Sequence, residues 1–220
     1  MTGKRNIAAS VRQRLLNRAR EERRPFQELL QYYAMERFLY RLSQSHHRNR
    51  FILKGALMLR IWEAPQARPT MDIDMLGRTN NDNDAVLAQV LEIIDQPVED
   101  DGMIFHAANL RAEQITEDAD YQGVRILFSG ELNGATVKMQ LDIGFGDIVH
   151  PAAHRATFPI LLNLPAPELL CYSRESAIAE KFQAMVYLGE LNSRMKDFYD
   201  IWLLARQFDF YPQAQPGSRA

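Results

Sequence analysis

Apolar residues recur at helical spacing near the start of the chain. Every fourth position from residue 7 is apolar; these residues are Ile7, Val11, Leu15 and Ala19. Because this spacing places them on one side of an α-helix, it predicts an amphipathic helix. A second helix is predicted over residues 25–43, which begin with a proline, a residue favoured early in helices, and continue with apolar positions.

Strict alternation of polar and apolar residues predicts strands in the middle of the chain. The segment TMDIDML, residues 70–76, alternates in this way. Its apolar members are expected to face the core; they are Met71, Ile73 and Met75. A hairpin is predicted over residues 124–146, because Asn133-Gly134 is a preferred two-residue turn between alternating segments.

Helices are predicted on both sides of these strands. An apolar run is interrupted at Lys54-Gly55, where we expect a turn followed by a helix. Further helical periodicity covers residues 85–95, 173–190 and 193–207. Since helices precede and follow strands that include a hairpin, we predict an α+β fold with a small mixed β-sheet core flanked by N-terminal and C-terminal helices.

The predicted organisation has four segments. They are an N-terminal helical segment (1–50), the sheet core (51–165), C-terminal helices (166–210) and a tail (211–220). The tail is polar and contains prolines, so it is expected to be disordered.

Composition and charge narrow the possible classes of protein. The net charge is −2 and Cys171 is the single cysteine, which excludes an internal disulfide and a cysteine cluster for zinc. The single cysteine indicates a reducing, cytoplasmic setting. No run approaches the ~18 apolar residues of a membrane span, so we expect no membrane partner. The first 24 residues hold eight basic and two acidic residues. The first helix therefore has an arginine-rich face, which is either solvated or a contact for nucleic acid.

Carboxylates are the main candidates for chemistry. Asp72 and Asp74 are two apart on a predicted strand, so both project from the same face. Asp142 lies on the polar face of the strand that follows the Asn-Gly turn. If the two strands are neighbours, three carboxylates converge and could hold Mg²⁺ or Mn²⁺, which prefer oxygen ligands. Taken alone, the Asp-x-Asp pair and Asp142 each fit a solvated strand end better than a metal site.

Other residues are suited to binding phosphate. Gly55 begins a predicted helix, where backbone N–H groups favour a phosphate, and Lys54 adds a positive charge. Arg68 could neutralise a phosphate or hold its loop, and Thr70 shares the strand face of the carboxylates. An ordinary turn glycine remains the alternative for Gly55.

Charged residues also mark the C-terminal helices. Lys181 could clamp a triphosphate, and Lys196 is predicted to help bind a nucleotide. Asp197 and Asp200 are three apart and share a helix face. The alternative for this group is a salt-bridged pair of surface helices. The pair His46-His47 has no third ligand at a suitable spacing, so no metal site is predicted there.

The order of these features resembles that of the polymerase-β-like nucleotidyltransferases. More narrowly, the chain resembles the AbiEii/AbiGii family of nucleotidyltransferase toxins. The resemblance extends from about residue 9 to residue 210 and is carried by several segments: SVRQRLLNRARE, RFLYRLSQS, FILKGALML, RPTMDIDML, LDIGFGD, AEKFQAMVYLG and NSRMKDFYDIWLL.

The resemblance implies a role for particular residues. Asp72 and Asp74 would bind the metal ions that bridge the triphosphate, and Asp142 would be the third, catalytic carboxylate. Gly55, with Lys54, would cradle the phosphates. Lys181 and Asp197 match two later positions that such enzymes need for activity.

The family also implies a reaction and partners. A nucleoside monophosphate would pass from an NTP to an acceptor hydroxyl, which for some members belongs to tRNA. The protein would act as the toxin of a toxin–antitoxin or phage-defence system, paired with an antitoxin protein.

Two departures from the family pattern keep other functions open. Ala56 follows the glycine, where Gly or Ser is usual, so its backbone N–H is predicted to help bind the nucleotide without a hydroxyl. Relatives continue beyond Phe210 with further helices. A non-catalytic or degenerate nucleotide-binding relative is therefore one alternative. A sugar-nucleotide transferase and an interaction module without a ligand are the others.

Overall fold

The computed structural model describes residues 6–64, 69–118, 121–189 and 192–208. Its elements are α1 (Ile7–Glu21), α2 (Phe26–Gln44), β1 (Phe51–Lys54), the 3-10 helix η1 (Gly55–Leu57), α3 (Met58–Ile61), β2 (Asp72–Gly77), α4 (Asn83–Ile94), β3 (Met103–Asp118), β4 (Tyr121–Leu132), β5 (Ala135–Phe145), β6 (His154–Thr157), β7 (Glu168–Cys171), α5 (Arg174–Leu188) and α6 (Met195–Gln207). The predicted disordered tail, residues 211–220, lies outside the described residues.

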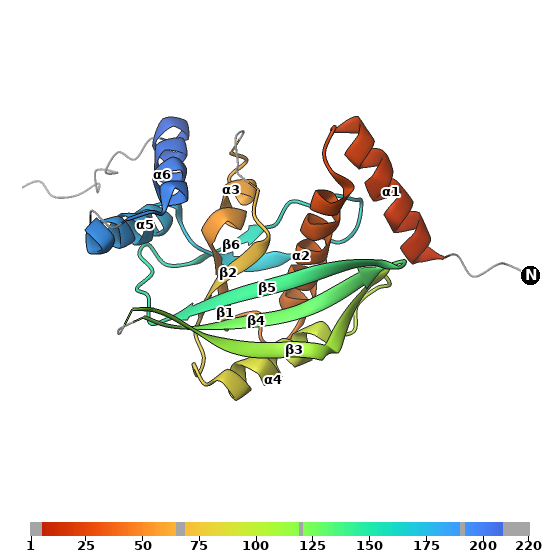
Figure 1. The fold of residues 1–220 in the computed structure, drawn as a ribbon, viewed down its shortest axis with the longest axis horizontal. Coiled ribbons are helices and arrows are strands. Elements are labelled where there is room, and N and C mark those ends of the chain that lie inside the picture. Colours follow the sequence, from red (N-terminus) through yellow and green to blue (C-terminus); the bar gives the residue numbers. More distant parts are fainter. Residues whose placement is uncertain (1–5, 65–68, 119–120, 190–191, 209–220) are drawn as a thin grey trace, which may run out of the picture.

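The seven strands form one mixed sheet in the order β3-β4-β5-β2-β1-β7-β6. Two neighbouring pairs are parallel, β2 with β5 and β1 with β7, and the other pairs are antiparallel. Helices precede, interrupt and follow the strands (Figure 1). The predicted α+β fold with a mixed sheet is confirmed. Among the described residues, no helix is long and apolar enough to cross a membrane.

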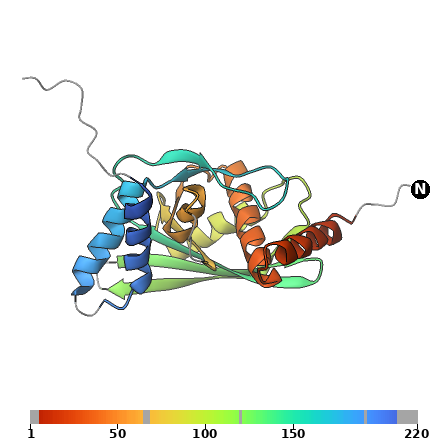
Figure 2. The same cartoon turned by 90° about the horizontal axis from the view of Figure 1, so that it is seen from above.

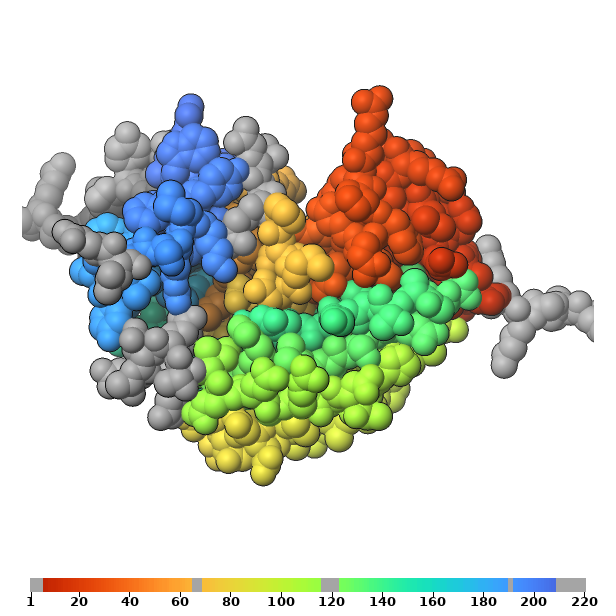
Figure 3. All heavy atoms as spheres, viewed as in Figure 1, coloured from red at the N-terminus to blue at the C-terminus, as the bar shows by residue number. Residues whose placement is uncertain are grey.

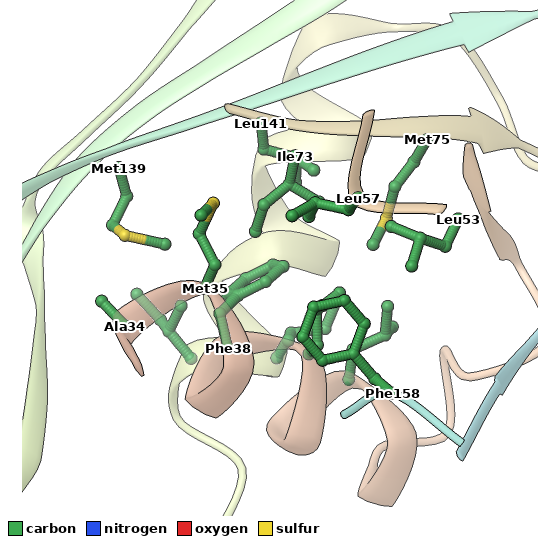
Figure 4. Packing of buried hydrophobic residues seen from close by; sticks show 14 of the residues in the cluster. Ala34, Met35, Phe38, Leu53, Leu57, Ile73, Met75, Met139, Leu141 and Phe158 are labelled. Atoms are coloured by element: carbon green, nitrogen blue, oxygen red, sulfur yellow. The ribbon is translucent and has the colours of Figure 1, made fainter. Parts of the chain in front are cut away.

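The main core lies between one face of the sheet and helices α2 and α4. Phe38 of α2 is fully buried and lies beside the side chains of β2 and β5 (Figure 4). Ile73 and Met75 of β2 face this core as predicted, with 0% and 1% exposure. Met71 does not: it precedes β2 and is 55% exposed. The polar residues of β2 and β5 lie on the opposite face of the sheet.

Four strands were not predicted, and their sequences explain why. β3 pairs only with β4, and its register shifts between His106 and Arg111, so exposed and covered positions do not alternate. β1, β6 and β7 have four residues each, too few to show a period. β1 is buried along its whole length, and such a short apolar run cannot be distinguished from a helix by pattern.

Four of the described helices form two pairs, whereas α4 packs against the sheet. Helices α1 and α2 pack against each other at one end, and α5 and α6 lie side by side at the other (Figures 1 and 2). The space-filling view shows α5 and α6, in blue, and the N-terminal helices, in red, as separate masses beside the strands (Figure 3). The polar face of β2 and β5 reaches the side of α5 and α6.

Candidate active site

Three carboxylates converge on adjacent parallel strands. β2 pairs with β5 so that Asp74 lies opposite Asp142, and Asp72 is two residues before Asp74 on the same face. Each can contribute one oxygen to a set whose members lie within 4.8 Å of one another. The predicted convergence is therefore observed. It depends on a parallel pairing between segments that are distant in sequence.

The three carboxylates repel one another, and Asp74 is the most affected. Burial, followed by the charges of Asp72 and Asp142, raises the pKa of Asp74 to about 7. A divalent cation relieves such repulsion, and a set of carboxylate oxygens suits Mg²⁺ or Mn²⁺. The donor set thus fits the predicted ion, with Asp72, Asp74 and Asp142 as the residues that would hold it.

Gly55 allows Asp74 to approach the backbone. Gly55 has a positive φ of +70°, and a Cβ atom placed on it would lie 2.0 Å from Oδ2 of Asp74. The sequence-based argument was that this glycine makes room for a phosphate. The structure shows that it also makes room for a carboxylate of the site. The predicted turn and helix are present as η1 and α3, and Ala56 is buried within η1.

Lys54 is buried beside the carboxylates. Its Nζ lies 2.8 Å from Oδ2 of Asp147 and 2.8 Å from Oε1 of Glu180. The positive charge predicted for phosphate binding is thus shared with two acidic side chains, and it ties β1 to α5. Thr70, which is also buried, donates its hydroxyl to Oδ1 of Asp72. Arg68 lies outside the described residues.

Lys181 joins the two C-terminal helices. Its Nζ lies 2.8 Å from Oδ1 of Asp197 and 2.8 Å from Oδ2 of Asp200, and both aspartates are buried. Burial alone would lower the pKa of Lys181, but the two aspartates outweigh it and raise the pKa. The lysine is therefore a permanent cation, and the α5–α6 contact contains the ion pairs considered in the sequence analysis.

These groups surround one open pocket of about 420 Å³. The predicted residues that line it are Lys54, Gly55, Asp72, Asp74, Asp142, Lys181, Lys196 and Asp197. Ala56 and Thr70 are buried and are not among the lining residues. Most of the predicted site is thus brought together, although it derives from strands β1, β2 and β5 and from both C-terminal helices.

Arg125 is a residue of the pocket that the sequence analysis missed. It lies on β4 directly opposite Asp142, with its Nε 2.8 Å from Oδ1 and a terminal nitrogen 2.8 Å from Oδ2. Gln140 donates a further hydrogen bond of 3.0 Å to Oδ2. Both oxygens of the third carboxylate are therefore engaged by donors. Arginines at alternate strand positions are common, so only the strand register identifies this one.

Replacing Arg125 is expected to tighten divalent metal binding. In Arg125→Ala the metal no longer competes with a bidentate guanidinium for Asp142, and a nearby positive charge is gone. We expect the Mn²⁺ dissociation constant to fall about tenfold, or ~1.4 kcal/mol, in a calorimetric titration. Arg111→Ala is the control, because Arg111 pairs with Glu113 on the exposed edge strand. Equal affinities for all three proteins would refute the competition.

Comparisons with known proteins identify the family and the fold. The family profile described as "Nucleotidyl transferase AbiEii toxin, Type IV TA system" matches residues 37–215. The crystal structure of JHP933 from Helicobacter pylori is 19% identical, with a TM-score of 0.52 over 83% of this chain and 67% of that chain. A putative nucleotidyltransferase from H. pylori is 17% identical, with a TM-score of 0.53 over 83% and 69%. These two likenesses concern the fold. Among curated proteins, none matches the sequence.

Proposed function

The chain belongs to the AbiEii family, the nucleotidyl transferase toxins of type IV toxin–antitoxin systems, and on this basis we propose that it transfers a nucleoside monophosphate from an NTP to a hydroxyl of RNA. The convergence of Asp72, Asp74 and Asp142 carries the proposal. An acceptor oxygen would form a bond to the α-phosphorus while the bond to the bridging oxygen breaks and pyrophosphate leaves.

The residues of the pocket would have different roles in this transfer. Mg²⁺ or Mn²⁺ held by the three aspartates would neutralise the triphosphate and the leaving pyrophosphate. Asp142 would accept the proton of the attacking hydroxyl once Arg125 and Gln140 no longer engage both of its oxygens. Lys196, which lines the pocket, would bind the phosphates. Gly55 would offer backbone to the same phosphates across from Asp74.

Lys181 and Asp197 would act as a pair. The lysine is held by two aspartates, so it is charged and fixed in place beside the pocket. A fixed positive charge favours the phosphates electrostatically and does not have to be reoriented during the reaction. In this proposal Asp197 and Asp200 position the lysine, and Lys181 contacts the nucleotide.

The first helix supports RNA as the acceptor. Arg14, Arg20 and Arg23 are exposed on α1 and the turn after it. Two further arginines of this region are engaged within the protein: Arg18 donates to the carbonyl of Leu161, and Arg24 pairs with Glu28. These three exposed arginines can contact RNA phosphates at a distance from the pocket. A folded RNA can reach both the arginines and the pocket. Membership of a toxin family also implies a paired antitoxin.

A labelling experiment tests the proposal. The purified chain is incubated with each α-³²P-labelled NTP, Mg²⁺ and total tRNA, beside an Asp72→Asn/Asp74→Asn control. We expect label in RNA from the wild type with at least one NTP, and none from the control or in EDTA. Label in protein instead of RNA would show that the acceptor is a protein hydroxyl. Nucleotide binding without any labelled product would favour the non-catalytic alternative.

A further inference from the structure

A second group of metal-binding side chains lies away from the carboxylates. His46 and His47 occupy the turn after α2, and Glu92 lies near the end of α4. Oε2 of Glu92 is 2.7 Å from Nε2 of His47 and 3.2 Å from Nε2 of His46. The expectation that the histidine pair lacks a third ligand is therefore wrong. The missing donor is 45 residues further along the chain.

The two imidazoles lie close together and face the same carboxylate. Their rings lie 3.8 Å apart at an angle of 41°, and both present Nε2 to the same carboxylate oxygen. His47 is only 2% exposed, and its backbone N–H donates to Oγ of Ser45, so its position is fixed. The third member, Glu92, and His46 are accessible to solvent. An ion can thus enter from the surface and meet one ligand that is already held.

The distances suit a small divalent ion. Zinc bonds of about 2.0–2.2 Å to nitrogen and oxygen place neighbouring ligand atoms about 3.3 Å apart in a tetrahedron. The observed separations from Glu92 are 2.7 and 3.2 Å, so binding requires only small movements. Two imidazoles and one carboxylate favour zinc over magnesium, which prefers an all-oxygen site.

We propose that His46, His47 and Glu92 bind a Zn²⁺ ion, with water in the fourth position. The ion would join the C-terminal end of α2 to α4. Both helices pack on the face of the sheet opposite the catalytic carboxylates, so the zinc stabilises the fold and takes no part in transfer. An ion that binds only the folded chain raises its stability by mass action.

Zinc titration of matched variants tests the proposal. The full chain is titrated with ZnCl₂ by calorimetry in saturating Mg²⁺, which occupies the carboxylate site. We expect one zinc-binding event in the wild type, weakened at least about tenfold in Glu92→Gln and His46→Gln. His106→Gln is the control, because His106 lies on β3 with Glu131 at 3.6 Å and does not belong to this trio. Zinc binding of equal strength in the wild type and Glu92→Gln would overturn the proposal, leaving a hydrogen-bonded trio.

Two further measurements identify the ligands. Co²⁺ in place of Zn²⁺ is expected to give a visible absorption spectrum typical of nitrogen ligation in the wild type and His106→Gln, and to lose it in Glu92→Gln. Zn²⁺ is expected to raise the thermal midpoint of the wild type and not that of Glu92→Gln. These readouts do not depend on nucleotide transfer, so they stand whether or not the enzymatic proposal does.

Discussion

Asp74→Asn is expected to abolish nucleotide transfer and, at the same time, to raise the thermal stability of the metal-free protein at pH 8. The loss of transfer should be about 10³-fold or more, because an amide cannot replace a carboxylate in holding a cation at the reacting phosphate. The gain in stability follows from the burial of Asp74 and from its repulsion by Asp72 and Asp142, which together raise the pKa of Asp74 to about 7.

The sign of the pH dependence follows from this pKa. A carboxyl whose folded pKa is about 7 holds a proton that the unfolded chain, in which the ordinary pKa is 3.8, has already released. The folded state therefore binds more protons between these values, so stability falls as the pH rises from about 4 to 7. At pH 8 the metal-free wild type carries the full repulsion, and the neutral asparagine removes part of it.

Thermal unfolding in EDTA at pH 5 and pH 8 measures this effect. We expect the midpoint of Asp74→Asn to exceed that of the wild type by about 4 °C at pH 8, which corresponds to ~1–2 kcal/mol, with little difference at pH 5. Mg²⁺ should raise the wild-type midpoint and leave the variant unchanged. Asp142→Asn is the control, because it also removes a charge but deprives Arg125 of its ion pair. A variant that is no more stable than the wild type at pH 8 would contradict the argument.

Gly55→Ala is expected to damage both the fold and the site. The new Cβ would lie 2.0 Å from Oδ2 and 2.7 Å from Cβ of Asp74, so the carboxylate or the turn must move by more than 1 Å. Displacement of that size costs about 10²-fold in catalysis, and we expect at least this loss of transfer. The positive φ of +70° adds ~1 kcal/mol or more of strain for alanine.

Gly134→Ala separates the two causes. Gly134 has a similar φ of +79°, but no atom lies within 4 Å of the position of an added Cβ. Alanine there carries the strain of the backbone without a clash, so we expect a loss of ~1 kcal/mol in stability and normal Mn²⁺ affinity. Urea unfolding and Mn²⁺ titration of the two variants make the comparison. Equal behaviour would show that Gly55 serves only its backbone conformation.

The elements whose residues follow a periodic pattern were predictable from sequence. The apolar period of α1, the alternation of β2 and the Asn-Gly turn before β5 all reflect local geometry, and they appear with boundaries within a few residues. The shared face of Asp72 and Asp74 follows from alternation alone. The order of these elements along the chain resembles that of the family. The three carboxylates could therefore be identified before their strands were known to be neighbours.

The remaining features depend on strand register and helix packing, so they could not be predicted from the local sequence. Arg125 meets Asp142 only because β4 and β5 pair in one particular register. Glu92 reaches the histidine pair because α4 packs beside the end of α2. The acidic partners of Lys54 likewise come from a loop and from α5. Each of these contacts joins segments that no sequence period connects.

The parallel pairing of β2 with β5 also determines when activity can first arise during synthesis. Asp74 leaves the ribosome well before its partner Asp142, and the pair cannot form until all of β4 and β5 has followed. Lys181 and Asp197 are translated later still. A nascent chain that stops before Asp142 therefore lacks the third carboxylate, and one that stops before Asp197 lacks the partner of Lys181, so activity is expected only from chains that extend past both.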